Sequence, residues 1–432
     1  MDGIVHNGND VAVMVNRLVA HDAFHLYPHR SSARESHFGS MARIGYAFAV
    51  VMLGTTLPTP LYTLYAARLG FSIGMSTTIF ATYAAGVVAA LILFGRWSDA
   101  LGRRPLLIAG LACSAASSLV FLAAGPVWQL LIGRALSGLS AGIFTGTATA
   151  MIIEAAPVKW KSRAITVAGV ANIGGLGIGS ALSGVLAQYV PWPLQCVFVV
   201  HLAMVGVAAL AIVHVNETVA TLPGTLLTMQ RLSIPSQARG VFTRAALAAC
   251  AGFCVIGLFT SVVPTFLRES LHVHDKAIAG LLVSAAFAAS AATQACTRTL
   301  PASRAMILGC VALILGAALL AVALSTRSVA MLSAAALVTG LGHGASFAKG
   351  LGAVVEAAPQ SRRGEIASAY FVVAYFAISV PILGVGFAAR FWSPSRIGIV
   401  FGVVVAAVAT AALLGTICAT RPRRVGRPGD NA

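Results

Sequence analysis

The chain has 432 residues and a mean hydropathy of +0.88, with 58% hydrophobic and 9% charged residues. Soluble domains carry about 25% charged and about 45–50% apolar residues, so this composition excludes a water-soluble globular fold, as well as disordered, collagen-like and disulfide-rich classes. The net charge of +17 would suggest nucleic acid in a soluble protein, but membrane topology also requires basic residues. The seven cysteines lie in apolar runs without a CxxC pair, so no metal site is expected.

Residues 1–40 are polar and histidine-rich, and we expect a disordered cytoplasmic tail, with Met41 as an alternative start of translation. Beyond them, apolar stretches recur, each long enough to cross a hydrocarbon core of roughly 30 Å as a helix. We place twelve, at 44–66, 72–94, 105–124, 127–153, 164–187, 194–213, 243–266, 276–297, 305–324, 329–354, 365–388 and 397–419. The sequence thus predicts an all-α polytopic membrane protein, because a β-barrel would show alternating ten-residue segments.

Basic residues are distributed unevenly over the connecting segments. With the N-terminus inside, 21 of the 29 Lys and Arg fall in inside segments and six in outside segments, while Arg134 and Lys349 fall within spans. Such a bias sets the orientation of a membrane protein. We therefore expect a multi-pass protein of the cell inner (plasma) membrane with both termini in the cytoplasm. The same bias explains most of the net charge without a nucleic-acid partner.

The chain repeats itself at an offset of 202 residues. Ile-Glu-Ala-Ala-Pro at 153–157 returns as Val-Glu-Ala-Ala-Pro at 355–359. At this offset Gly138, Gly142, Lys161 and Arg96 return as Gly340, Gly344, Arg363 and Arg298. We therefore expect two pseudo-symmetric six-helix halves at 41–215 and 243–420, a cytoplasmic linker at 216–242 and a basic cytoplasmic tail at 421–432. Duplicated halves are a transporter design that holds substrate at their interface near mid-membrane.

The loop after the second span reads Gly95-Arg-Trp-Ser-Asp-Ala-Leu-Gly-Arg-Arg-Pro105. It resembles the Gly-x-Leu-x-Asp-x-x-Gly-basic-basic signature of the major facilitator superfamily, from which it departs at Trp97 and Ala100. Glycines permit a tight turn, and an Asp can pair with a cation or a helix N-terminus. The predicted gating motif consists of Gly95, Arg96, Asp99, Gly102, Arg103 and Arg104.

The fourth span carries Arg134, Gly138 and Gly142 on one helix stripe, and it resembles the Arg-x-x-x-Gly-x-x-x-Gly element of the same family. An arginine about 10 Å deep is expected to face a cavity or a partner, with snorkelling to outside water as the alternative. Asn172 and the glycines of the fifth span are similar to a signature of proton-coupled exporters. That signature has Pro where this chain has Ser180, and tight helix packing explains the glycines equally well.

Two glutamates end the fourth and tenth spans with a matching spacing. Glu154 precedes Lys161, and Glu356 precedes Arg363, each by seven residues. They resemble ion pairs that tie helix ends together in one conformation, and we add all four to the gating set. An exposed ion pair contributes only about 0–1 kcal/mol, which suits a latch that must open. Solvated helix ends are the alternative.

Polar and aromatic residues within the spans are candidates for the substrate and ion pathway. Lys349 either lines the central cavity or reaches the inner headgroups, and His343 is either a proton carrier or a packed histidine. Pro58, Pro60 and Pro264 should kink spans one and seven. The complete candidate set is Tyr62, Tyr83, Arg134, Asn172, Gln294, His343, Lys349, Tyr370 and Tyr375.

The resemblance, which covers nearly all of 42–420, implies a twelve-span transporter of the drug/proton antiporter branch that works by alternating access. No GxxxxGK[ST] motif occurs, so an ion or substrate gradient must supply the energy. We expect a monomeric, proton-coupled exporter of small organic solutes that is not an enzyme and binds no cofactor or metal. The alternative is an uptake symporter for an organic anion, suggested by Arg134 and Lys349. A cavity with two cations and no deep carboxylate should favour anionic or neutral substrates.

Overall fold

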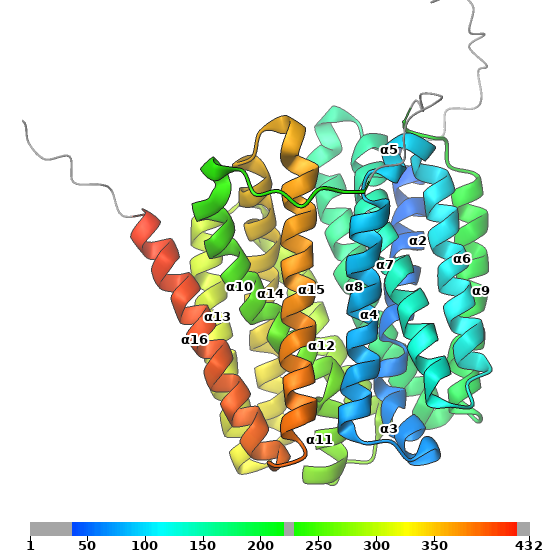
Figure 1. Ribbon diagram of the computed structural model, residues 1–432, viewed down its shortest axis with the longest axis vertical. Helices are drawn as coiled ribbons and strands as arrows, with labels where there is room; N and C mark the ends of the chain where they lie inside the picture. Colours follow the sequence, from blue (N-terminus) through cyan, green and yellow to red (C-terminus); the bar gives the residue numbers. More distant parts are fainter. Residues whose placement is uncertain (1–36, 220–228, 421–432) are drawn as a thin grey trace, which may run out of the picture.

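The computed structural model describes residues 37–219 and 229–420, and within these ranges it is helical and contains no strand. Twelve of the helical segments are long and apolar enough to cross a membrane, as the sequence predicted. They stand side by side as one bundle, with the N-terminal half on the right of Figure 1 and the C-terminal half on the left. The predicted tail at 421–432 and most of the predicted tail at 1–40 lie outside the described residues.

Each half contributes six spans. The N-terminal half consists of α2 (His37–Thr56), α3 (Pro58–Leu69), α4 (Ile73–Phe94), α5 (Trp97–Leu101), α6 (Arg103–Leu122), α7 (Val127–Ala155), α8 (Lys161–Tyr189) and α9 (Pro193–Val213). The C-terminal half consists of α10 (Arg239–Ser261), α11 (Val263–Ser270), α12 (Lys276–Cys296), α13 (Ala302–Thr326), α14 (Val329–Glu356), α15 (Arg363–Ala388) and α16 (Pro394–Thr420). Helices α2 and α10 begin earlier than the sequence suggested, at His37 and Arg239, so residues 37–40 are helical and the linker is shorter.

Proline interrupts the first span of each half. The first span breaks at Leu57, because Pro58 follows and cannot donate a helical hydrogen bond. The seventh span breaks at Val262, directly before the segment that contains Pro264. Both breaks agree with the kinks that the prolines predicted. A break in a membrane-spanning helix frees backbone carbonyls that another group must satisfy.

The two halves repeat the same glycine contacts. Gly138 of α7 packs against the Tyr83 carbonyl of α4, and Gly340 of α14 packs against the Ala286 carbonyl of α12. A Cβ atom at either position would overlap that carbonyl. Small residues let membrane helices approach closely where no water drives them together. The predicted repeat is therefore present in the packing as well as in the sequence.

Two seams join the halves, one between α4 and α15 and the other between α8 and α12. Helices α4 and α15 run next to each other in Figure 1. Glycines bring the backbones together in both seams: Gly74 faces Gly386, and Gly184 faces Gly280. We call the end of the bundle that carries Arg96, Arg104 and the turn at 156–160 the basic end. The end with residues 70–72, 190–192 and 389–393 is called the opposite end.

Candidate transport pathway and gating motif

Arg103 is the centre of the gating motif at the basic end. Its guanidinium forms ion pairs with Asp99 at 2.7 Å and Glu154 at 2.9 Å, and it also donates to the Ser98 hydroxyl. Arg103 can start α6 directly after the turn because Gly102 has a φ of +98°, which favours glycine. The motif therefore ties the α4–α6 loop to the end of α7.

The start of the linker is attached to the same cluster. The Glu217 carboxylate accepts hydrogen bonds from the backbone N–H groups of Arg103 and Arg104, each at 2.9 Å. A carboxylate at this position is stabilised by the positive end of the α6 dipole. The Thr218 hydroxyl donates to Glu154 at 2.6 Å. Neither residue was predicted, because a linker acid carries no sequence signal that identifies the helix end it will cap.

The two Glu-x6-basic pairs are not the ion pairs expected from the sequence. Glu154 contacts Arg103 instead of Lys161, since Arg103 approaches from the neighbouring helix α6. Glu356 and Arg363 form no ion pair with each other within the described residues. Arg96 forms no ion pair in those residues either. Among the described residues the gating contact is therefore present in the N-terminal half alone, and the two halves differ in ion pairing at this end.

The second part of the linker, residues 229–235, forms a strap across the basic end between the halves (Figure 1). The Gln230 N–H donates to the Ile92 carbonyl of α4 at 2.8 Å, and its side chain packs where a Cβ of Gly95 would lie. On the other side, the side-chain amide nitrogen of Gln230 lies close to Gly364 at the start of α15, 4.0 Å from where a Cβ atom on that glycine would be. Gln230 thus bridges the two helices of one seam.

Arg134 lies inside the N-terminal half and is only 1% exposed. It donates a hydrogen bond to the Thr55 carbonyl, which belongs to the last turn of α2 before the break at Leu57. Its guanidinium also lies 4.6 Å from the centre of the Tyr83 ring, in a cation–π contact. The predicted alternative of snorkelling is wrong for this residue, because its charge is held by the broken first span and by α4.

An aromatic row continues from Tyr83 into the C-terminal half. Ring centres are 6.1 Å apart between Tyr83 and Tyr375, 6.4 Å between Tyr375 and Phe253, and 4.7 Å between Phe253 and His343. His343 accepts from or donates to the Ser290 hydroxyl at 2.9 Å through Nδ1. We call Arg134, Tyr83, Tyr375, Phe253 and His343 the central row. The row connects the two halves through the seam between α4 and α15.

Three buried polar atoms on or beside this row have no hydrogen-bond partner among the described residues. They are the hydroxyl of Tyr62, Nε of Arg134 and Nε2 of His343. Leaving a buried polar atom unpaired costs about 1–3 kcal/mol, so such atoms are few in native proteins. All three belong to residues that the sequence singled out. Each of these atoms can therefore form a further hydrogen bond, as a donor in the case of the Arg134 guanidinium.

Other predicted pathway residues have different environments. Lys349 donates to the carbonyls of Arg298 and Leu300 at 2.8 and 2.9 Å, so it holds the end of α12 and does not line a central cavity. Tyr370 packs within the C-terminal half and donates to the Ala245 carbonyl. Gln294 lies in the α8–α12 seam, next to Gly169, and donates weakly to Ser290. Asn172 is half-buried on α8 and has no hydrogen-bond partner within the described ranges.

A second buried histidine was missed by the sequence analysis. His201 of α9 contacts the Ser118 hydroxyl at 2.6 Å and the Val50 carbonyl at 3.2 Å. Both ring nitrogens are satisfied, which distinguishes His201 from His343 and makes it a packing residue. A histidine in the middle of an apolar span was the available signal. Across the two described ranges, no cluster of three potential metal ligands occurs.

Two six-helix halves, connected across their interface by the central row, define a membrane transporter fold. Residues 44–382 match the model of the Major Facilitator Superfamily, and the chain belongs to that family. A solved bacterial homologue of the human lysosomal transporter Spinster, described as inward-facing and unoccupied, superimposes with a TM-score of 0.69. The alignment covers 90% of this chain and 99% of that one at 14% identity, so it supports the fold.

Curated relatives match over shorter stretches. The inner membrane transport protein YajR of Escherichia coli K12 is 27% identical over 42% of this chain and 38% of its own length. The class D tetracycline resistance protein of Salmonella ordonez is 31% identical over 28% of this chain and 31% of its own. Multidrug resistance protein MdtL of Klebsiella pneumoniae is 26% identical over 47% and 52%. The chain thus matches about a third to a half of the length of these relatives.

Proposed function

We propose that this transporter is a proton-coupled exporter of small organic solutes that works by alternating access in the inner membrane. The central row carries the proposal, because it continues from one half into the other and contains unpaired polar atoms of both, Nε of Arg134 and Nε2 of His343. Relatives named for tetracycline and multidrug resistance support export over uptake. His343 is the proposed proton carrier, with Ser290 as its hydrogen-bond partner.

The orientation belongs to the same proposal. The basic end faces the cytoplasm, in line with the excess of Lys and Arg on that side. The strap and the Arg103 cluster are then part of the inner gate, and the protein acts as a monomer. The alternative of anion uptake loses one of its two supports, since Lys349 binds backbone carbonyls and does not face the centre. Arg134 remains and favours anionic or neutral substrates over permanent cations.

The test is transport by inside-out and right-side-out vesicles that contain the purified protein and a pH-sensitive dye. We expect anionic or neutral drugs to accumulate in inside-out vesicles when the interior is acidic and to release protons from it. His343→Ala should abolish the proton movement, whereas the matched change His201→Ala should alter stability without selectively uncoupling. Accumulation only in right-side-out vesicles would establish uptake. Robust transport of quaternary ammonium dyes, unaffected by Arg134→Ala, would contradict the predicted charge preference.

A further inference from the structure

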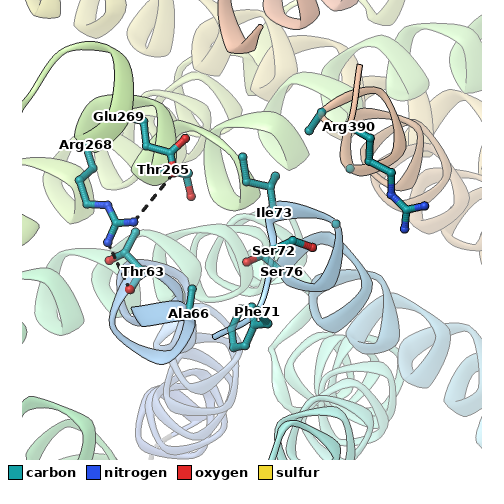
Figure 2. Close-up of a pocket in the computed structure, with 13 residues that line it drawn as sticks. Thr63, Ala66, Phe71, Ser72, Ile73, Ser76, Thr265, Arg268, Glu269 and Arg390 are labelled. Carbon is teal, nitrogen blue, oxygen red and sulfur yellow. Dashed lines mark hydrogen bonds and ion pairs between the residues drawn. The ribbon is translucent and has the colours of Figure 1, made fainter. Parts of the chain in front are cut away.

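Two pockets adjoin each other at the opposite end of the bundle. The first, of about 310 Å³, lies between α3 and α4 of the N-terminal half and α11 and α15 of the C-terminal half (Figure 2). The second, of about 150 Å³, is lined mainly by α10, α11, α13, α15 and α16, with Ile73 of α4. They share the wall residues Ile73, Glu269 and Ala389. Together they form a hollow with two compartments.

The first compartment, called the polar compartment below, is the more polar of the two and carries unpaired hydroxyl groups. Ser76 is 4% exposed, lines the pocket, and its hydroxyl has no hydrogen-bond partner within the described ranges. Ser72 is the N-cap residue of α4 and makes no side-chain capping bond. Figure 2 shows both hydroxyls between the Arg268–Glu269 side and the Arg390 side. The start of a 22-residue helix adds backbone N–H groups and a positive partial charge at this point.

The charges around the polar compartment leave one cation uncompensated. Arg268 lies 3.9 Å from the Glu269 carboxylate and donates to the Thr63 carbonyl of α3, in the other half, at 3.4 Å. Arg390 has no carboxylate partner within the described residues, and its guanidinium lies 5.8 Å from the Phe387 ring centre. One free guanidinium, two hydroxyls and a helix N-terminus together fit an anionic group.

The second compartment is apolar. Its walls include Leu258, Val262, Phe266, Leu320 and Ile397, and Trp392 lies at its side. Such a lining takes an alkyl chain, because burying methylene groups away from water is favourable. We propose that the double pocket binds a single-chain amphiphile, with its anionic head group at Ser76 and Arg390 and its chain against Val262 and Trp392. Both halves line the polar compartment, so binding favours the arrangement of the halves in which it is complete. The proposal goes beyond transport and does not depend on it.

The test uses Trp392 as a local reporter. A variant that keeps Trp392 and replaces Trp97, Trp128, Trp160 and Trp192 by Phe is purified in a neutral maltoside detergent. Nitroxide-labelled dodecyl phosphate should quench its fluorescence saturably. A variant that keeps only Trp128, which is 57% exposed at the same end, reports non-specific partition into the detergent. Unlabelled dodecyl phosphate should compete, whereas inorganic phosphate and dodecyltrimethylammonium should compete poorly.

Arg390→Gln and Val262→Phe should each weaken binding about tenfold or more, by removing the charge and by filling the apolar compartment. Arg68→Gln is the matched control, because Arg68 is exposed on the same end and lines neither pocket. The proposal would be overturned if Trp392 and Trp128 were quenched equally. It would also be overturned if the quenching of Trp392 persisted in both Arg390→Gln and Val262→Phe. Equal competition by the cationic amphiphile or by inorganic phosphate would also overturn it. None of these readouts requires transport, so a failed export assay leaves the test intact.

Discussion

Arg103 holds two carboxylates of unequal exposure. The side chain of Glu154 is 33% exposed and that of Asp99 is 64% exposed, whereas Arg103 itself is 11% exposed. Water screens the Asp99 pair more strongly, so it contributes at the low end of about 0–1 kcal/mol. Glu154 also accepts from Thr218, which couples the pair to the linker. The Glu154 contact is therefore the stronger half of the latch.

Asp99→Asn and Glu154→Gln should both leave the protein folded but slow the exchange between the two access states. The effect should be larger for Glu154→Gln, since it removes the better shielded pair and weakens the contact with the linker. Initial transport rates in vesicles at matched protein content measure this. Glu356→Gln is the control, because Glu356 has no ion pair within the described residues. Wild-type rates for both gating variants would show that the motif is not a latch.

Arg134 binds a backbone carbonyl next to the break in the first span. Arg134→Lys keeps the charge, but the ammonium lacks the planar group that spans both the Thr55 carbonyl and the Tyr83 face. We expect substrate transport to fall at least about tenfold, equivalent to about 1.4 kcal/mol, while thermal unfolding shifts modestly. Tyr83→Phe, which keeps the ring face, should retain more activity than Arg134→Lys. If Tyr83→Phe were less active than Arg134→Lys, the cation–π contact would not explain the role of Arg134 in transport.

At the scale of helices, glycines decide which elements touch. Gly138 and Gly146 belong to the same helix α7, but Gly138 lies against the Tyr83 carbonyl, whereas a Cβ at Gly146 would meet nothing within 4 Å. Gly138→Ala should therefore destabilise the fold by about 1–3 kcal/mol through overpacking. Gly146→Ala should be neutral or stabilise by up to about 1 kcal/mol, because alanine favours helix. Thermal unfolding in detergent compares the two, and equal shifts would contradict the close α4–α7 contact.

The strap provides a second test at this scale. Gln230 is 9% exposed between α4 and α15, whereas its neighbour Met229 is 58% exposed. In a background with the native cysteines replaced by serine, Met229→Cys should react with a maleimide much faster than Gln230→Cys. Asp99→Asn should change the Gln230→Cys rate if the strap leaves the seam when the gate opens. Equal labelling rates in the unmodified background would show that the strap does not bridge the halves.

At the scale of the whole molecule, charge and duplication predict the same topology. Two six-span halves place the end of α9 and the start of α10 on one side, where the linker crosses the basic end (Figure 1). A reporter enzyme fused after Asn431 should be active only as a cytoplasmic reporter, and one inserted at Gly125, between α6 and α7, only as a periplasmic reporter. Activity of both fusions on the same side would refute the twelve-span orientation.

The sequence by itself determined the membrane class and the twelve spans, because lipid requires each span to be a long apolar helix. It also determined the two halves, because the same residues recur at an offset of 202. It also singled out Arg134, Tyr83, Tyr375 and His343 as polar or amphipathic residues within spans, and all four lie on the central row, but their role in transport stays a prediction. Only the tertiary structure decided the partners. Glu154 pairs with Arg103 and not with Lys161. Lys349 donates to the carbonyls of Arg298 and Leu300. Gln230 of the linker lies between the helices of a seam. Such contacts join elements far apart in the chain, so local spacing carries no information about them.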